Sequence, residues 1–65
     1  MKRDDYLFRK LERLVDYGVS LLLNGKPATP DQVARKIASA GEHYKPGFKY
    51  SEEGNLSELN YVRIA

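Results

Sequence analysis

Hydrophobic and polar positions alternate with the period of an α-helix over the first third of the chain. Leucines and one glycine form a stripe at steps of four and three residues, and a second apolar stripe runs beside it. Together the stripes cover an arc of about 160° on a helical wheel, whereas a surface helix that docks once buries about 100°. The first stripe consists of Leu7, Leu11, Leu14, Gly18 and Leu21, and the second of Phe8, Val15, Val19 and Leu22.

This pattern predicts a long helix from Asp5 to Leu23. Asp4 or Asp5 can cap its first turn, where an acidic side chain suits the positive end of the helix dipole. Asn24 and Gly25 favour the left-handed conformation in which many helices end. Gly18 would then lie inside the helix, where glycine costs about 1 kcal/mol relative to alanine. We therefore expect another backbone to approach closely at Gly18.

A second, shorter helix is predicted from Pro30 to Ala40. Thr29 and Gln32 have the spacing of a capping box, and proline at the first helical position loses no hydrogen bond. Gly41 is a suitable stop signal. Because only residues 24–29 connect the two predicted helices, we expect them to pack as an αα-hairpin.

The last third of the chain favours a β-hairpin. Pro46-Gly47 is typical of a type II turn, and Phe48 and Tyr50 alternate with Lys49 as in a strand. These signals predict strands at about residues 47–52 and 58–64. The three-residue spacing of Leu56, Leu59 and Val62 also fits a helical turn, which remains the alternative. The expected fold class is thus α+β, with residues 1–65 forming one small domain.

Composition restricts how so short a chain can be stabilised. The sequence has 65 residues, no cysteine and one histidine. Disulfides, thiolate metal sites and a histidine-based zinc site within one chain are therefore excluded. Cores of this size rarely supply more than about 3–5 kcal/mol of net stability. Association with another chain is the remaining source of additional stability.

Catalytic chemistry has little support in the sequence. His43 is the one side chain suited to acid–base work near neutral pH, but no nucleophile accompanies it. The serines stand in no nucleophile motif, and the five glycines do not cluster into a phosphate-binding loop. We expect a protein that is not an enzyme and needs no cofactor.

Membrane insertion is not indicated either. The longest run of strictly apolar residues is Leu21–Leu23, whereas a membrane span needs about 20 such residues. No apolar segment follows the charged first residues, so no signal peptide is expected. Together with the absence of cysteine, this predicts a soluble cytoplasmic protein.

Net charge is +2, and residues 25–50 by themselves carry a net charge of +3. Residues 27–37 resemble the first helix of a helix-turn-helix unit, although Pro46-Gly47 interrupts the stretch in which a recognition helix would follow. The acidic groups of residues 51–65 would oppose binding of a phosphate backbone. Candidate residues for nucleic-acid binding are Arg35, Lys36, Lys45, Lys49 and Tyr50.

The function that we expect is that of a small, non-enzymatic regulator or adaptor acting through protein–protein contacts, as a homodimer that also binds an unidentified protein. The wide apolar arc of the first helix supplies the predicted interaction surface. The alternative is a small DNA-binding transcriptional regulator that uses the second helix or the basic hairpin. The predicted protein-interaction residues are Leu7, Phe8, Leu11, Leu14, Val15, Gly18 and Leu22.

Overall fold

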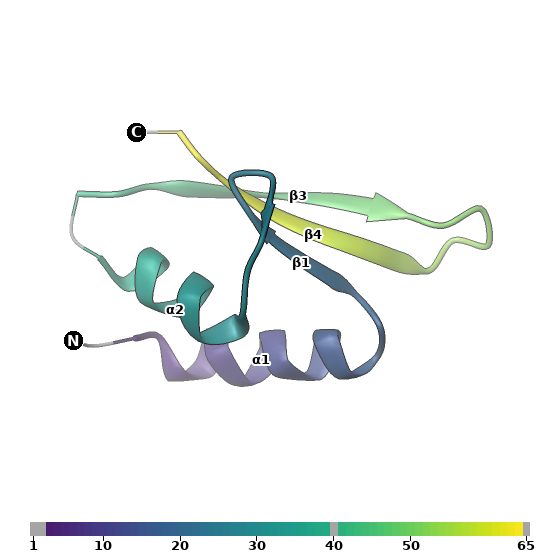
Figure 1. Cartoon of the computed structure of the whole chain (residues 1–65), viewed down its shortest axis with the longest axis horizontal. Coiled ribbons are helices and arrows are strands. Elements are labelled where there is room, and N and C mark those ends of the chain that lie inside the picture. The colour runs from purple at the N-terminus through teal and green to yellow at the C-terminus, as the bar shows by residue number, and fades with distance from the viewer. Residues whose placement is uncertain (1–2, 40, 65) are drawn as a thin grey trace.

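The computed structural model describes residues 3–39 and 41–64. Within these ranges the elements are, in order, α1 (Asp5–Asp16), β1 (Ser20–Leu23), β2 (Lys26–Pro27), α2 (Pro30–Ala38), β3 (Tyr44–Tyr50) and β4 (Leu56–Arg63). Both helices lie on one side of the sheet and leave its other side open (Figure 1). The α+β class predicted from the sequence is therefore confirmed.

The strands form one mixed sheet in the order β2–β1–β4–β3. β1 runs parallel to β4, with Leu21 beside Leu59. β2 pairs with β1, and β3 with β4, in antiparallel fashion. The central pair therefore joins a strand from the first half of the chain to the last strand, while β2 and β3 form the two edges.

The predicted αα-hairpin is wrong, because two strands separate the helices. α1 ends at Asp16, not at Leu23. The backbone NH of Gly18 donates to the carbonyl of Val15, and Gly18 itself has φ +95°, a left-handed conformation that stops the helix. Gly18 thus lies in a turn, and the expected close approach of another backbone is absent, because a Cβ added there would meet no described neighbour within 4 Å.

The apolar segment after Gly18 forms a strand because it finds a distant partner. Periodicity alone cannot distinguish a short apolar run in a strand from one in a buried helix. Residues 20–23 pair with β4. The paired residues Ser20 and Glu58 are 38 positions apart in the sequence. Asn24 and Gly25, with φ values of 53° and 80°, then form a tight hairpin turn into β2 rather than a helix cap.

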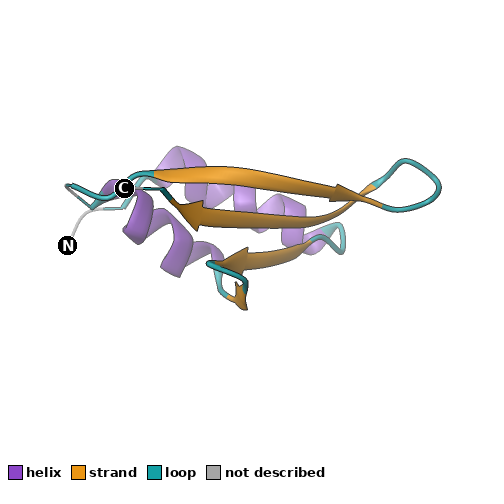
Figure 2. Ribbon diagram, turned by 90° about the horizontal axis from the view of Figure 1, so that it is seen from above, coloured by secondary structure: helices purple, strands orange, loops and turns teal. Residues whose placement is uncertain are grey.

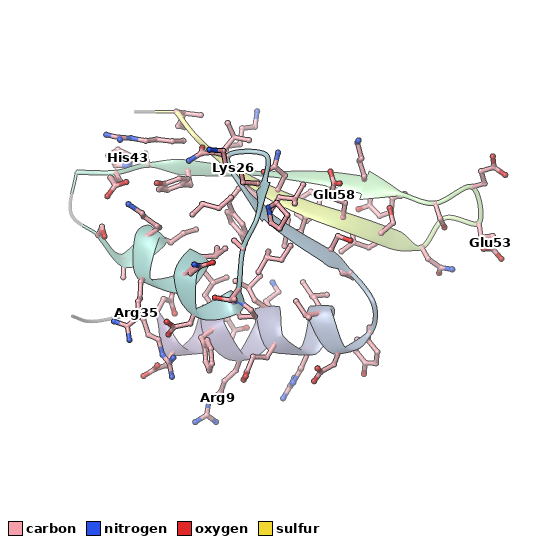
Figure 3. The ribbon with its side chains drawn as sticks, viewed as in Figure 1. Arg9, Lys26, Arg35, His43, Glu53 and Glu58 are labelled. Carbon is pink, nitrogen blue, oxygen red and sulfur yellow. The ribbon has the colours of Figure 1, made fainter. Side chains whose placement is uncertain are left out.

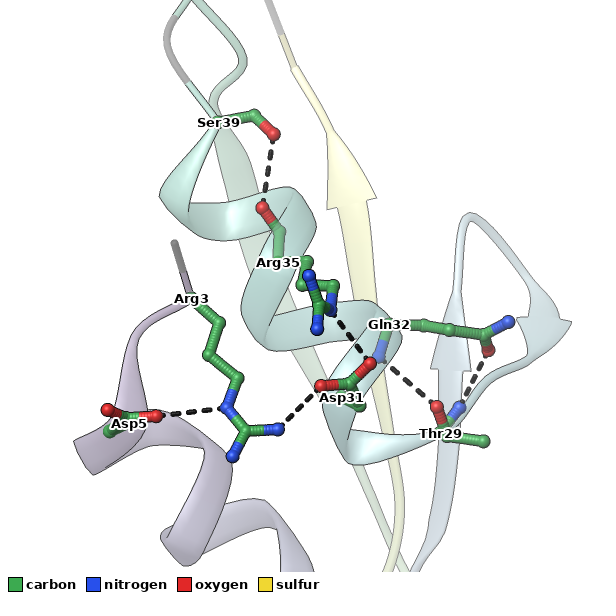
Figure 4. Close-up of polar contacts among 7 residues, drawn as sticks. All are labelled: Arg3, Asp5, Thr29, Asp31, Gln32, Arg35 and Ser39. Carbon is green, nitrogen blue, oxygen red and sulfur yellow. Dashed lines mark hydrogen bonds and ion pairs between the residues drawn. The ribbon is translucent and has the colours of Figure 1, made fainter. Parts of the chain in front are cut away.

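The predicted caps at the N-terminal ends of both helices are confirmed. The Thr29 hydroxyl accepts from the backbone NH of Gln32 at 3.1 Å, and the Gln32 side chain accepts from the backbone NH of Thr29 at 2.9 Å (Figure 4). Asp4 caps α1, because its carboxylate accepts from the backbone NH of Leu7 at 3.0 Å. α2 ends at Ala38, so the predicted end at Ala40 is two residues too far, and Ala40 lies outside the described residues.

A C-terminal β-hairpin is also confirmed, with strands at Tyr44–Tyr50 and Leu56–Arg63 rather than 47–52 and 58–64. Pro46-Gly47 is not a turn, because both residues lie inside β3. β3 can accommodate Pro46 because it is an edge strand, in which a missing NH can face solvent. The hairpin turns at residues 51–55, close to the gap between the two predicted strands, and Gly54 has φ +88° there.

The core lies between the helix layer and the two central strands. Val33 and Ala34 of α2 are fully buried, and Leu11 of α1 is 1% exposed. Leu59 anchors the sheet side from β4. Half-buried residues surround this centre: Leu7, Leu14, Leu23, Ala28, Ile37, Leu56 and Tyr61.

The hairpin of β3 and β4 extends beyond the helices. Its turn lies at one extreme of the long axis, past the end of α1 (Figures 1 and 2). The molecule measures 37 × 23 × 16 Å and exposes 4846 Å². A compact monomer of this mass would expose about 4,200 Å². The elongated shape therefore exposes more surface than a compact one of the same mass.

Candidate functional site

The predicted interaction face of α1 is divided by the fold. Leu11 is buried, and Leu7 and Leu14 pack against the core. These three leucines therefore contact the protein's own α2 and sheet. Phe8 is half-buried beneath the guanidinium of Arg3, whose carbon lies 3.7 Å from the ring centroid.

The other predicted interaction residues do not continue that face. Val15 is 40% exposed near the end of α1, and Gly18 is exposed in the following turn. Leu22 lies on β1 and pairs with Asn60, on the open side of the sheet. The structure thus brings Leu7, Leu11 and Leu14 together in the core and leaves Val15, Gly18 and Leu22 outside it.

The predicted basic residues lie on two different layers. Arg35 and Lys36 belong to α2, whereas Lys45 and Lys49 belong to β3. Glu58 is the residue of β4 that pairs with Lys49. Figure 3 shows Arg35 on the helix layer and Glu58 on the opposite side of the sheet. The four basic residues therefore do not form one surface for a phosphate backbone.

Most of these cations also have acidic neighbours. Arg35 forms an ion pair with Asp31 at 2.9 Å. Lys36 lies 4.0 Å from the carboxylate of Glu42, and Lys49 lies 3.9 Å from that of Glu58.

The resemblance to a helix-turn-helix unit ends after α2. Residues 44–50, where a recognition helix would be expected to begin, form strand β3. No helix follows α2 within the described residues 41–64. The first half of the motif is therefore a well-capped helix without a groove-reading partner.

Asp31 joins the N-terminal segment to α2 (Figure 4). The Arg3 guanidinium donates to one Asp31 oxygen at 2.6 Å and the Arg35 guanidinium to the other at 2.9 Å. These hydrogen bonds, that of Arg3 first, lower the pKa of Asp31. Arg3 also donates to Asp5 at 2.9 Å. This cluster contributes to holding the two helices together.

The feature that sequence reasoning missed is the outer edge of β3. Among the described residues, no strand pairs with this side of β3. The carbonyls of His43 and Lys49 accept from the backbone NH of Ile64 and the hydroxyl of Ser57, so the odd-numbered positions face β4. Since backbone groups alternate along a strand, the even-numbered positions face solvent. These positions are Tyr44, Pro46, Phe48 and Tyr50.

Two aromatic side chains accompany these free backbone groups. Phe48 pairs with Leu59 and Tyr50 with Leu56, so both point to the helix side of the sheet. Because β3 is an edge strand, no further strand of the described residues covers them, and Phe48 is 53% and Tyr50 64% exposed. Lys45 and Lys49 alternate with them and face the open side. We call these four side chains, with the outward backbone groups of β3, the β3 edge.

Sequence signals indicate part of this surface. The alternation of Phe48, Lys49 and Tyr50 is evident in the sequence, but its place at a sheet edge depends on β1 pairing with β4. At the start of the strand, the hydroxyl of Tyr44 donates to Glu42 at 2.8 Å. This hydrogen bond and burial raise the pKa of Tyr44.

Other sites are less developed. His43 is exposed just before β3. Residues 3–39 and 41–64 contain no group of three or more His, Cys, Asp or Glu side chains arranged to hold a metal ion. Neither described helix has the length and apolar character needed to cross a bilayer.

No family model matches the sequence, and comparisons with curated proteins and with solved structures gave no significant match.

Proposed function

We propose that this chain is a small, non-catalytic regulator or adaptor that binds another protein through the β3 edge. One observation carries the proposal: an edge strand with free backbone groups bears two exposed aromatic side chains on a hairpin that projects past the helices. Addition of a strand from a partner would satisfy those groups, with side-chain contacts supplying specificity.

The exposed side chains of the β3 edge are of a kind suited to a protein–protein interface. Aromatic residues are enriched in such interfaces, and tyrosine is enriched among their energetic hot spots. Phe48 and Tyr50 therefore supply anchors that the protein's own core does not use.

Features of the strand favour a specific partner over indiscriminate pairing. Natural edge strands are protected by lysine and proline, and β3 carries Lys45, Pro46 and Lys49. Pro46 removes one outward NH, while those of Tyr44, Phe48 and Tyr50 remain. A partner must therefore tolerate the gap at Pro46 to pair with the rest of the edge.

We do not propose self-association through α1, because the central leucines of this helix pack in the protein's own core. A homodimer would use the β3 edge instead. DNA binding gains no specific support, because the predicted basic residues lie on two different layers, α2 and β3.

Selection from a random octapeptide library displayed on phage tests the proposal. Three proteins are compared: the wild type, the double variant Phe48→Thr/Tyr50→Thr, and the control Tyr6→Gln/Tyr17→Gln. Threonine keeps strand propensity, and the control removes two aromatics that are 81% and 85% exposed elsewhere. Circular dichroism and thermal unfolding verify that all three proteins fold.

Peptides selected on the wild type should bind the control equally. They should bind the double variant about thirtyfold more weakly, since loss of a hot spot costs about 2 kcal/mol. Equal binding to the double variant, or no enrichment on any of the three proteins, contradicts the proposal.

A further inference from the structure

Resting on the proposed function, we propose that the partner of the β3 edge is an extended segment with acidic side chains at alternate positions and apolar side chains between them. The acidic side chains would lie beside Lys45 and Lys49, and the apolar ones beside Phe48 and Tyr50. The positive charge of β3 and the alternation of its lysine and aromatic side chains between the two faces of the sheet lead to this assignment.

The backbone of β3 determines that the segment is extended. Outward NH groups belong to Tyr44, Phe48 and Tyr50, and outward carbonyls occur at these positions and at Pro46. Only another extended backbone presents donors and acceptors at the same spacing of every second residue. A helix presents no such row, because its backbone groups bond within the helix.

The lysines determine the charge on one face of the added strand. Side chains on neighbouring strands stand about 4.5–5.5 Å apart at Cβ, so residues of the partner would adjoin Lys45 and Lys49 directly. Lys45 pairs with Val62, and no carboxylate of the described residues forms an ion pair with it. The side chain of Lys49 is 74% exposed although it approaches Glu58. Both ammonium groups can therefore form an ion pair with a carboxylate of the partner.

The opposite face of the added strand meets a different surface. Phe48 and Tyr50 lie on the helix side, where Leu56 and Leu59 continue the apolar surface toward the core. Partner residues on this side must be apolar to cover the two rings. Because side chains alternate between faces along a strand, the requirements combine into an alternating acidic and apolar sequence.

A second copy of the chain fits this edge poorly. Antiparallel pairing of two β3 strands centred on Gly47 would place Lys45 of each copy opposite Lys49 of the other. Pairing centred on Phe48 would bring the two Lys49 side chains into diagonal contact. Like charges directly opposite each other destabilise a sheet. The lysines therefore favour an acidic partner over a homodimer.

The same octapeptide library provides the test, now selected in parallel on the wild type and on Lys45→Glu/Lys49→Glu. The matched control is Arg9→Glu/Lys10→Glu, which makes the same charge change on exposed positions of α1. Figure 3 shows Arg9 pointing away from the sheet. The single variant Lys45→Glu leaves the contact between Lys49 and Glu58 intact and protects the test against loss of folding.

Sequences selected on the wild type should alternate acidic with apolar residues, and those selected on the charge-reversed variant should alternate basic with apolar residues. Wild-type peptides should lose at least about tenfold in affinity on the double variant, less on Lys45→Glu, and little on the control. Raising the salt concentration should weaken the binding further, because salt screens exposed charges.

The two proposals fail in different ways. Peptides that depend on Phe48 and Tyr50 but carry no acidic pattern, or that bind Lys45→Glu/Lys49→Glu unchanged, overturn the acidic partner and leave the binding edge standing. Peptides that ignore the aromatic pair as well overturn both proposals. Concentration-dependent dimerisation of the wild type that is abolished by Phe48→Thr/Tyr50→Thr would assign the edge to a second copy and overturn the acidic partner.

Discussion

Replacing Gly18 by alanine should change the free energy of unfolding in opposite directions depending on whether Gly18 lies in a helix or in a turn. In a helix interior, alanine is more stable than glycine by about 1 kcal/mol. Gly18 has φ +95°, with open space around its Cα. An added methyl group would therefore meet no neighbour, and the cost arises from the backbone alone, about 1–2 kcal/mol for an L-residue in the left-handed region.

The matched control is Gly47→Ala. Gly47 lies in β3 without a positive φ, and a Cβ there would meet the Asn60 carbonyl oxygen at 3.5 Å, an ordinary contact. Alanine should stabilise this strand position by about 0.5–1 kcal/mol.

Urea unfolding followed by circular dichroism measures both effects. The free energy of unfolding of a small protein falls by about 1 kcal/mol per M of urea. The urea midpoint should therefore fall by about 1–2 M for Gly18→Ala and rise by up to about 1 M for Gly47→Ala. A higher midpoint for Gly18→Ala would refute the turn and restore the long helix.

Three further changes test the packing, the cap and the ion pairs. Leu11→Ala should lower the free energy of unfolding by about 2–5 kcal/mol because the side chain is buried, and an unchanged urea midpoint would move Leu11 out of the core. Thr29→Ala should cost about 0.5–2 kcal/mol through loss of the capping box, and a thermal midpoint equal to that of the wild type would contradict this. Hydrogen bonds from Arg3 and Arg35 lower the pKa of Asp31, so its contribution is present above the unfolded pKa of about 3.9 and lost as pH falls through the folded value. The wild type should therefore exceed Asp31→Asn in thermal stability at pH 6 and match it near pH 2, and a difference that persists at low pH would refute the role of the charge.

Local chemistry makes part of the fold predictable. The capping box of Thr29 and Gln32 involves atoms three residues apart, so the sequence alone specifies it. Asp4 is a similar case. The turn around Gly54 also follows from nearby residues, because glycine supplies the left-handed conformation at no steric cost.

Non-local pairing decides the rest. Residues 21–23 are apolar throughout, and residues 20–23 become a strand because β4 is available beside them. Asn24-Gly25 suits a helix end, but the same pair between apolar runs is also typical of a two-residue hairpin. Pro46-Gly47 suits a turn, and the edge position that tolerates proline inside a strand is visible only once the strand order is known.

The same limitation applies to the candidate site. An apolar arc continued to Leu23 on one helix would be too wide for one small domain to cover. A shorter α1 packed on α2 and the sheet buries Leu11 and half-buries Leu7 and Leu14. The exposed aromatic residues of the candidate site belong instead to β3, whose edge position follows from the sheet order.

Amide hydrogen exchange of β3, measured by NMR with and without a saturating octapeptide selected on the wild type, tests the binding edge most directly. In the free protein, the amides of Gly47 and Lys49 should be protected by β4, and those of Phe48 and Tyr50 should exchange rapidly. At saturation, Phe48 and Tyr50 should become protected while Gly47 and Lys49 stay so. Unchanged rapid exchange at Phe48 and Tyr50 in the saturated complex, with new protection confined to the helices, would contradict the account.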